Sequence, residues 1–208
     1  MNMKLEYTEK PVQIIINGRA TLTVMTHADN LLDLVYGILY TERVVDSMDN
    51  IDSIIVEDPQ VSIVTKHPYS ILLSRKTVLA GCGGASSFLD SGKLGTIEHS
   101  ISISESELKR SADLVPTSVW VGAGLFFEDG ALLYTAEDLT AQNVADTLIG
   151  HALREHIELG RTYVVLRGNC TAETMRKLII AKIPAVKLIG QITDAARKIA
   201  EESGLSVW

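Results

Sequence analysis

Alternating apolar and polar residues in the first quarter of the chain predict β-strands. Two such runs, residues 12–16 and 20–26, flank Asn17-Gly18, which is the strongest short signal for a hairpin because both residues tolerate a positive φ. After Asp29, a residue type that caps helices well, apolar residues recur at the spacing of a helix. The pattern therefore predicts a hairpin followed by a helix capped by Asp29.

Three further apolar runs follow this helix, and Pro59 and Pro68 separate them; the runs are IDSIIVED, VSIVTK and YSILLSR. Because proline interrupts strands, this pattern is typical of a β-meander. The hairpin, helix and meander together form a β-rich N-terminal subdomain that we expect to span residues 1–78.

Residues 79–208 show a different pattern, in which strands are mixed with helices. Ser104 and Glu107 form a capping box that opens a short helix, and a second hairpin turns at Asp129-Gly130. A long helix is predicted from Gln142 to Gly160, where the glycine is expected to end it.

The last quarter of the chain alternates between strands and helices at short spacing. The strands YVVLRG, AVKLIG and LSVW are separated by two helices that begin after Thr171 and Thr193. Short connections of this kind imply parallel strands joined by crossover helices. We therefore predict an α/β fold, with the β-rich part at residues 1–78 and an α/β domain at residues 79–208.

Composition narrows the classes of protein to consider. The 208 residues carry a formal net charge of −7 and no basic stripe, so we expect no nucleic-acid binding. Basic pairs such as Arg176-Lys177 are expected on solvated helix faces. No apolar run approaches the roughly 20 residues that cross a membrane, and the N-terminus lacks the layout of a signal peptide. Two distant cysteines, Cys82 and Cys170, suggest a reducing, cytoplasmic setting.

Cys82 lies in the glycine-rich stretch KTVLAGCGGASSF. A cysteine acts as a nucleophile or sulfur carrier when its thiolate is accessible and its pKa is lowered. The adjacent Gly81, Gly83 and Gly84 give access and expose backbone N–H groups that can stabilise an anion. The alternative is a small residue buried in a tight turn, since free cysteine is often buried. The local sequence leaves both interpretations open.

No set of residues in the sequence has the spacing of a metal site. Structural zinc needs about four ligands, and Cys82 has no C-x-x-C partner. The zinc deaminase signature, H-x-E followed by P-C-x-x-C, is absent as well. His151 and Glu155 lie one helical turn apart, but two ligands are too few, so we expect a solvated helix face. The histidines outside predicted helices are expected to be polar surface residues: His27, His67 and His99.

Two strand-to-helix junctions carry polar residues that a ligand could use. Glu137 and Asp138 end a strand just before a helix, where they either favour the helix N-terminus electrostatically or face a ligand at the carboxyl end of the strand. Gly168 and Asn169 form a similar turn. Its N–H groups either hold a phosphate or belong to a simple cap made by Thr171. The cysteine in this turn is expected to be a passenger.

The order of these motifs resembles that of the formate dehydrogenase accessory protein family, often called FdhD. The stretch EKPVQIIINGRATLTVMTHADNLLDLVYGILYTERVV is similar to the opening of the family, and the shared positions are Asn17, Gly18, Met25, Asp29, Asp33, Leu34, Gly37 and Glu42. Of the family's Cys-Gly-x-Cys-Gly loop only one cysteine remains, Cys82. That loop falls either on Leu79–Gly83 or on Cys82–Ser86.

A second part of the resemblance is EDLTAQNVADTLIG, which aligns with the family's Glu-Asp-Val-Gly-Arg-His-Asn-Ala-x-Asp-Lys-x-x-Gly. The positions that agree include Glu137, Asp138, Asn143, Asp146 and Gly150. The family's Gly, Arg, His and Lys are replaced here by Thr140, Ala141, Gln142 and Thr147.

The resemblance implies a cytidine-deaminase-like three-layer domain without a zinc site, in a protein that forms a homodimer. It implies a sulfur carrier, or a sulfurtransferase if the chain is active, that takes sulfur from a cysteine desulfurase as a persulfide on Cys82. The recipient would be the molybdenum or tungsten pterin cofactor of a formate dehydrogenase. The implied ligand is of the molybdopterin guanine dinucleotide type, and the residues expected around it are Gly81, Gly83, Gly84, Glu137, Asp138, Asn143, Gly168 and Asn169.

The replaced residues favour a second interpretation, a binding or assembly module that keeps the fold without the chemistry. Arginine, histidine and lysine supply the cationic donors that grip phosphates or steer a thiolate, and arginine binds phosphate through two parallel hydrogen bonds. Their loss leaves open whether this chain transfers sulfur.

Overall fold

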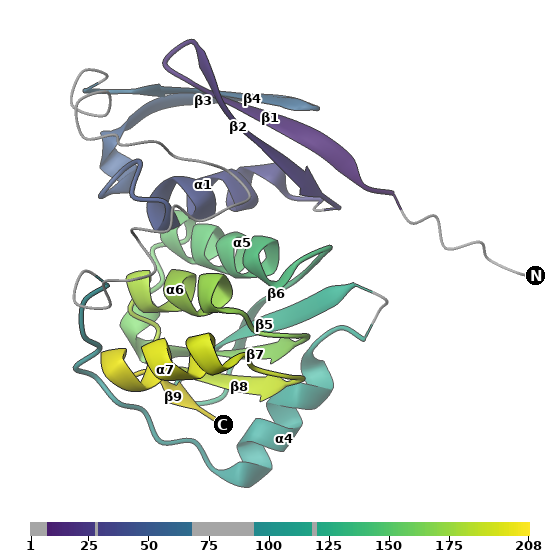
Figure 1. Cartoon of the computed structure of the whole chain (residues 1–208), viewed down its shortest axis with the longest axis vertical. Coiled ribbons are helices and arrows are strands. Elements are labelled where there is room, and N and C mark those ends of the chain that lie inside the picture. The colour runs from purple at the N-terminus through teal and green to yellow at the C-terminus, as the bar shows by residue number, and fades with distance from the viewer. Residues whose placement is uncertain (1–7, 28, 68–93, 118–119) are drawn as a thin grey trace, which may run out of the picture.

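Figure 1 presents a computed structural model, which describes residues 8–27, 29–67, 94–117 and 120–208. A four-stranded sheet lies at one end of the molecule, and helix α1 covers its inner face. Helices α5, α6 and α7 form the next layer, and a five-stranded sheet and helix α4 follow (Figure 1). This arrangement confirms the predicted α/β class with a β-rich N-terminal part. The predicted boundary between residues 78 and 79 lies outside the described residues.

The N-terminal sheet contains the strands that the first quarter of the chain predicts, in the order β2-β1-β4-β3. Asn17 and Gly18 have φ values of 51° and 75°, which confirms the predicted hairpin turn. The meander is wrong in one respect, because β4 pairs in parallel with β1 as well as antiparallel with β3. The strands are β1 (Lys10–Ile16), β2 (Arg19–Thr26), β3 (Ile51–Glu57) and β4 (Gln60–Thr65). The third predicted run, residues 69–75, lies outside the described residues.

Helix α1 (Leu31–Thr41) begins one residue later than the sequence predicts. Asn30, and not Asp29, is its N-cap, because the Asn30 side chain accepts a hydrogen bond from the Asp33 backbone N–H at 3.2 Å. The apolar face of the helix packs against β1 and β4, and its buried members are Leu31, Leu34, Val35, Ile38 and Leu39. A short 3-10 helix, η1 (Met48–Asn50), then leads into β3.

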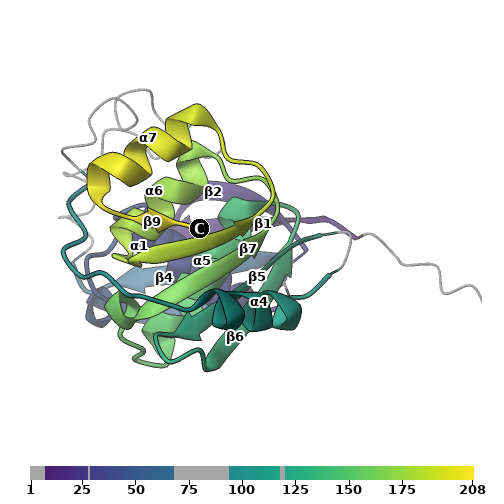
Figure 2. The ribbon, with the colours of Figure 1, turned by 90° about the horizontal axis from the view of Figure 1, so that it is seen from below.

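The second sheet has the order β6-β5-β7-β8-β9, and its last three strands are parallel, as predicted. Helices α5, α6 and α7 cover one face, while α4 lies on the other (Figures 1 and 2). The strands are β5 (Val121–Phe127), β6 (Leu132–Asp138), β7 (Thr162–Arg167), β8 (Ala185–Ile189) and β9 (Ser206–Val207). The helices are α4 (Glu105–Leu114), α5 (Ala141–Arg154), α6 (Ala172–Ile180) and α7 (Asp194–Ser203).

Helix boundaries in this half follow the capping residues, with one exception. Ser104, Thr171 and Thr193 each accept a hydrogen bond from the backbone of the first turn of their helix, as predicted. Helix α5, however, ends at Arg154 and not at Gly160. His156 adopts a left-handed φ of 55°, and the Ile157 N–H bonds to the Ala152 carbonyl oxygen at 2.8 Å, so the chain turns away before the glycine.

Gly160 lies in a short 3-10 helix, η3 (Leu159–Arg161), that precedes β7. Among the described helices, none is long and apolar enough to cross a membrane.

The two halves of the protein meet where α1 packs on α5, and glycine permits the contact. A Cβ on Gly37 would lie 1.8 Å from the Asp146 carbonyl oxygen, and a Cβ on Gly150 would lie 1.8 Å from the Asp33 carbonyl oxygen. Real carbon and oxygen atoms do not approach so closely, so any side chain at either position would push the helices apart. The two glycines therefore set the distance between the N-terminal sheet and the rest of the fold.

Replacing either helix glycine with alanine is expected to destabilise the protein. Alanine favours a helix interior over glycine by about 0.5–1 kcal/mol, so a loss of stability would report the clash and not the helix propensity. We expect Gly37→Ala and Gly150→Ala each to lower the free energy of unfolding by about 2–3 kcal/mol, measured by urea denaturation.

Gly160→Ala is the matched control, because no atom lies within 4 Å of a Cβ at that position. Its free energy of unfolding should stay within about 0.5 kcal/mol of the natural protein. Equal stability in all three variants would contradict the close packing of α1 on α5.

Candidate functional site

Several of the predicted site residues lie at one edge of the five-stranded sheet. Because β5 runs antiparallel to both β6 and β7, the strands β6, β7 and β8 all point the same way and end at this edge. Helices α5, α6 and α7 begin there, each capped by a threonine. We call residues 137–143, 167–171 and 189–193 the carboxyl edge. Ligands commonly bind at the carboxyl ends of strands in α/β sheets, so this is the candidate site.

Asp138 is buried at the carboxyl edge and its carboxylate is already bound by the protein. One oxygen accepts from the Thr26 hydroxyl at 2.5 Å, and the other accepts from the backbone N–H groups of His27 (2.9 Å) and Leu139 (2.6 Å). These three donors leave little capacity for a ligand. Asp138 therefore holds the end of β2 against the end of β6.

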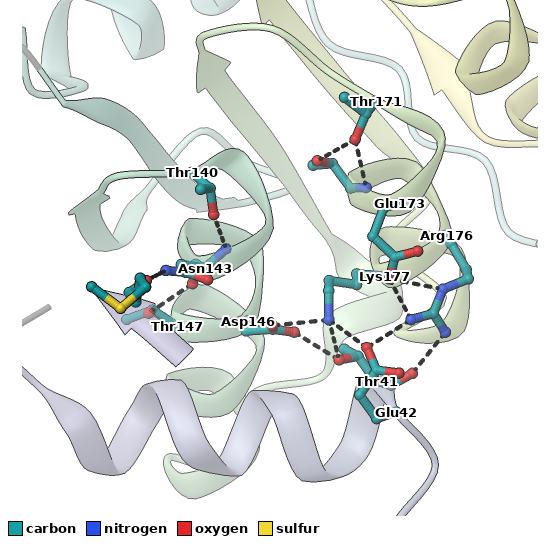
Figure 3. A network of polar contacts seen from close by, with 12 residues as sticks. Thr41, Glu42, Thr140, Asn143, Asp146, Thr147, Thr171, Glu173, Arg176 and Lys177 are labelled. Carbon is teal, nitrogen blue, oxygen red and sulfur yellow. Dashed lines mark hydrogen bonds and ion pairs between the residues drawn. The ribbon is translucent and has the colours of Figure 1, made fainter. Parts of the chain in front are cut away.

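Asn143 makes a second contact between the same two segments. Its side-chain amide donates to the Met25 carbonyl oxygen at 2.8 Å, while its backbone N–H donates to the Thr140 hydroxyl at 3.2 Å (Figure 3). In the next turn of α5, the Thr147 hydroxyl donates to the Asn143 carbonyl oxygen at 2.9 Å. Asn143 thus positions the N-terminal hairpin at the carboxyl edge.

Glu137 and Arg167 differ from Asp138, because each has a buried polar atom without a partner among the described residues. The atoms are Oε1 of Glu137 and Nε of Arg167. Both residues are in register with Gly122 on the strand between them, so they lie on the same face of the sheet, roughly 10 Å apart across two strand spacings. The Pro116 carbonyl oxygen covers Gly122, and the Arg167 guanidinium donates to the Ala112 carbonyl oxygen at 2.6 Å.

The turn at Gly168 and Asn169 uses its polar groups within the protein. The Gly168 N–H donates to the Ile189 carbonyl oxygen at 3.1 Å, and the Asn169 side chain accepts from the Gln191 N–H at 3.2 Å. Gly168 has a φ of 146°. A Cβ on Gly190 would lie 2.1 Å from the carbonyl oxygen of Gly168. The two turns pack backbone against backbone, which favours a capping role for this turn over phosphate binding.

The structure describes Cys170 but not Cys82. Cys82 lies outside the described residues, as do Gly81, Gly83 and Gly84. Cys170 is fully buried, and burial raises the pKa of its thiol to about 11. A buried thiol with a raised pKa is unreactive at neutral pH, as expected for a passenger in its turn.

The His151 ring packs against Asp33 and Tyr134. Its Nδ1 lies 3.2 Å from the Asp33 carboxylate, which also pairs with Arg154, and its ring stacks on Tyr134 with 3.7 Å between the ring centroids. His151 is therefore not on the solvated helix face that the sequence predicts, whereas Glu155 is exposed. Across the described parts of the chain, no group of three or more His, Cys, Asp and Glu side chains has the arrangement of a metal site.

A buried ionic network joins α1, α5 and α6, and sequence analysis missed it (Figure 3). Lys177 contacts the Asp146 carboxylate at 2.9 Å, the Glu42 carboxylate at 2.8 Å and the Thr41 hydroxyl at 3.1 Å. Its neighbour Arg176 pairs with Glu42 at 2.7 Å and with Glu173 at 2.5 Å.

The prediction that Arg176 and Lys177 lie on a solvated helix face is therefore wrong, since they are only 8% and 4% exposed. Three acidic partners compensate the buried charge of this pair, and two of them are distant in the sequence. The adjacent residues Arg176 and Lys177 therefore do not reveal these distant partners in the sequence.

Burial and charge act in opposite directions on this network. Burial raises the pKa of Asp146. Burial opposes ionisation of Glu42 too, but the cations of Lys177 and Arg176 outweigh it and lower the pKa of Glu42. Lys177 likewise has a raised pKa, because Asp146 and Glu42 outweigh the effect of its burial. Glu42 is thus held as a carboxylate at the contact between α1 and α6.

A sequence profile of the FdhD/NarQ family matches residues 7–208, nearly the whole chain. The chain belongs to the FdhD/NarQ family. This confirms the resemblance that the N-terminal stretch and the EDLTAQNVADTLIG segment suggested.

Curated relatives in the FdhD/NarQ family are named "Sulfur carrier protein FdhD". The protein from Sulfurisphaera tokodaii is 28% identical over 195 residues, which cover 88% of this chain and 76% of the relative. The protein from Shouchella clausii is 28% identical over 215 residues, which cover 93% of this chain and 79% of the relative.

A crystal structure described as a formate dehydrogenase accessory protein, from Desulfotalea psychrophila, is similar with a TM-score of 0.76 and 18% identity. The match covers 96% of this chain and 81% of that one. At this level of identity the comparison confirms the fold.

The adjacent carboxyl groups Glu137 and Asp138 should respond oppositely to loss of charge. Asp138→Asn is expected to lower the free energy of unfolding by about 2–3 kcal/mol, because an amide cannot accept from all three donors. Glu137→Gln should leave stability unchanged or slightly higher, because it removes the charge of a carboxylate whose buried Oε1 has no partner among the described residues. Chemical denaturation of both variants at neutral pH measures the difference, and equal losses would contradict the division of roles.

The lowered pKa of Glu42 predicts a specific pH dependence of stability. A carboxyl whose pKa is lower in the folded state stabilises above the unfolded pKa, and this contribution is lost as pH falls through the folded pKa. Glu42→Gln should therefore be less stable than the natural protein at pH 7. The difference should shrink below about pH 4, near the ordinary pKa of glutamate.

Denaturation midpoints from pH 3 to pH 7 test this dependence. Glu201→Gln, at an exposed position without an ion pair among the described residues, should follow the natural protein throughout. A pH-independent difference for Glu42→Gln would rule out its stabilisation as a carboxylate.

Proposed function

We propose that this chain is a sulfur carrier that supports maturation of the molybdenum or tungsten pterin cofactor of a formate dehydrogenase, with a persulfide on Cys82. The observation that carries the proposal is the contrast between the two cysteines. The family match spans both, but Cys170 is sealed in the core with a pKa of about 11. Of the two cysteines, we therefore assign Cys82 as the sulfur carrier, in the glycine-rich stretch that resembles the family's Cys-Gly-x-Cys-Gly loop.

Loading of Cys82 is a thiol exchange that needs no external oxidant. The Cys82 thiolate attacks the terminal sulfur of a persulfide on a cysteine desulfurase. A new S–S bond forms on Cys82, the S–S bond of the desulfurase breaks, and the desulfurase cysteine leaves as a thiolate. The amides of Gly81, Gly83 and Gly84 would stabilise the anionic sulfur. Release of the terminal sulfur as sulfide then consumes two electrons, which a thiol reductant supplies.

We further propose that the pterin or guanine group of the cargo cofactor binds at the carboxyl edge, near Glu137 and Arg167. Oε1 of Glu137 and Nε of Arg167 are buried without a hydrogen-bond partner among the described residues, which supports this placement. The ring edges of pterin and guanine offer N–H donors for a carboxylate, and their carbonyl oxygens or the attached phosphates suit a guanidinium. Asp138, Asn143, Gly168 and Asn169 support this edge through their contacts within the protein. The proposed partners are a cysteine desulfurase and a formate dehydrogenase, and the proposed assembly is a homodimer.

Sulfur loading can be tested directly by mass spectrometry. The protein is incubated with a cysteine desulfurase and cysteine, and its intact mass is compared before and after treatment with a thiol reductant. The natural protein and Cys170→Ala should gain the mass of one sulfur atom, which the reductant removes. Cys82→Ala should gain none. A persulfide that remains on Cys82→Ala, or no gain in the natural protein beside an active control carrier, would refute the proposal.

A second candidate function is a non-catalytic assembly module, and the α5 N-terminus favours it. The positions where the family has Gly, Arg, His and Lys are Thr140, Ala141, Gln142 and Thr147 here. Thr140 caps the helix, while Ala141 and Thr147 are buried. These residues serve packing and supply no cation. If Cys82→Ala still supports formate dehydrogenase activity in cells, the assembly module is the better account.

A further inference from the structure

Strand β3 is an edge strand of the four-stranded sheet, and the backbone N–H and C=O groups of alternate residues in it point away from β4. The amides of Gln13 and Asn17 on the β1 side donate to the carbonyl oxygens of Pro59 and Ile63, so the odd-numbered residues of β4 face β1. The even-numbered residues of β4 then face β3. Backbone groups alternate in direction along a strand, so Ser53, Ile55 and Glu57 of β3 bond to β4.

The backbone groups of Ile54 and Val56 consequently point outward. Among the described residues, neither is engaged in a backbone hydrogen bond on that side. A row of unpaired N–H and C=O groups is the template to which another extended chain can add.

The side chains of this edge are apolar and exposed. Ile55 is 56% exposed and Val56 is 42% exposed, although they point to opposite faces of the strand. Ile55 is in register with Ser62 on the outer face, where neighbouring Val64 is also 45% exposed. No described helix or strand lies over this outer face, because α1 covers the other side of the sheet (Figure 1). An added strand would therefore find apolar contacts on either side of its backbone.

Acidic residues surround this edge. Asp46 and Asp49 precede β3, and Asp52 and Glu57 lie within it; all four are exposed, and within the described ranges none makes an ion pair. Asp58 follows the strand and pairs with Lys10 at 2.5 Å. The one basic residue between positions 44 and 66 is Lys66. The edge thus combines the outward backbone groups of Ile54 and Val56, exposed aliphatic side chains and four acidic residues that make no ion pair within the described ranges.

We propose that β3 is a docking edge for an extended, basic segment of a partner protein, which adds to the sheet as a fifth strand. The outward groups of Ile54 and Val56 would supply the main-chain hydrogen bonds. Side chains on one face of the segment would contact Ile55, those on its other face would contact Val56, and its lysine or arginine residues would lie near Asp52 and Glu57. Strand addition of this kind takes affinity from the backbone and specificity from alternate side chains.

A second copy of this chain is a poorer occupant than a basic partner. If two β3 strands paired antiparallel about a two-fold axis, the end of one copy that carries Asp52 would lie against the end of the other copy that carries Glu57. Like charges directly opposite one another destabilise a strand pair. A segment with lysine or arginine at alternate positions turns the same contacts into attraction. This inference does not depend on sulfur transfer.

The probe is a fluorescein-labelled peptide, acetyl-Val-Lys-Val-Lys-Val-Lys-Val-amide, added to the full chain. Fluorescence anisotropy measures its binding, and NMR hydrogen exchange follows individual amides. In the free protein the amides of Ile54 and Val56 should exchange faster than that of Ile55, which bonds to β4. The peptide should slow Ile54 and Val56 by about tenfold or more. Slow exchange at Ile54 and Val56 in the free protein would mean that the edge is already occupied, and would overturn the proposal.

Variants separate strand addition from general charge attraction. Asp52→Asn with Glu57→Gln should weaken binding by about three- to tenfold. The control, Glu201→Gln with Glu202→Gln, makes the same change in net charge on exposed positions of α7 and should have no effect. Equal weakening by both pairs would overturn the proposal.

Backbone pairing is tested on both partners. Val56→Pro removes an outward N–H and should weaken binding by about tenfold, while circular dichroism checks that the protein stays folded. A peptide with N-methyl groups on alternate amides should bind equally weakly to the natural protein, so the test does not rest on one variant. If the N-methylated peptide binds as well as its parent, no strand is added and the proposal fails.

Discussion

The contact between α1 and α5 is the constraint on which the rest of this fold depends. Backbone meets backbone there, because a Cβ on Gly37 or Gly150 would lie 1.8 Å from a carbonyl oxygen of the opposite helix. Two small sheets, each with a modest core, thereby become one protein with α1 and α5 as shared inner layers (Figure 1). Close packing of this kind cannot adjust gradually, so polar residues at its periphery must match one fixed geometry.

Polar contacts on two sides of this helix pair use that fixed geometry. On one side, Asp138 and Asn143 hold the end of β2 at the carboxyl edge. On the other, Lys177 joins the end of α1 to α5 and α6 (Figure 3). A buried ion pair contributes little net stability, because desolvation offsets the attraction, but removal of one partner is costly. Loss of Glu42 or Asp146 would therefore leave Lys177 buried with less compensation, while the hydrogen bonds of Asp138 and Asn143 keep the N-terminal hairpin beside the candidate site.

The sequence predicted the elements that depend on local chemistry. The Asn17-Gly18 turn, the caps at Ser104, Thr171 and Thr193, and the parallel order of the last strands all follow from neighbouring residues. Two of the errors arise where distant segments of the chain determine the structure. The parallel pairing of β4 with β1 depends on the crossover through α1, and the burial of Lys177 depends on acids from two other helices. The end of α5 was missed because a histidine, not a glycine, takes the left-handed conformation.

The roles of Glu137 and Asp138 could be distinguished only from the structure, because they depend on which segments each side chain contacts. In sequence they are equivalent acids at a strand-to-helix junction, but alternation along β6 turns them to opposite faces of the sheet. Asp138 meets the end of β2 and is satisfied by three donors, whereas Glu137 lies beside Gly122 with a buried oxygen that has no partner among the described residues. Burying an unsatisfied carboxylate oxygen costs free energy. The fold tolerates this cost at Glu137, and on the same face of the sheet the Nε of Arg167 also has no partner among the described residues, so hydrogen-bonding capacity remains at Glu137 and Arg167 and not at the better-connected Asp138.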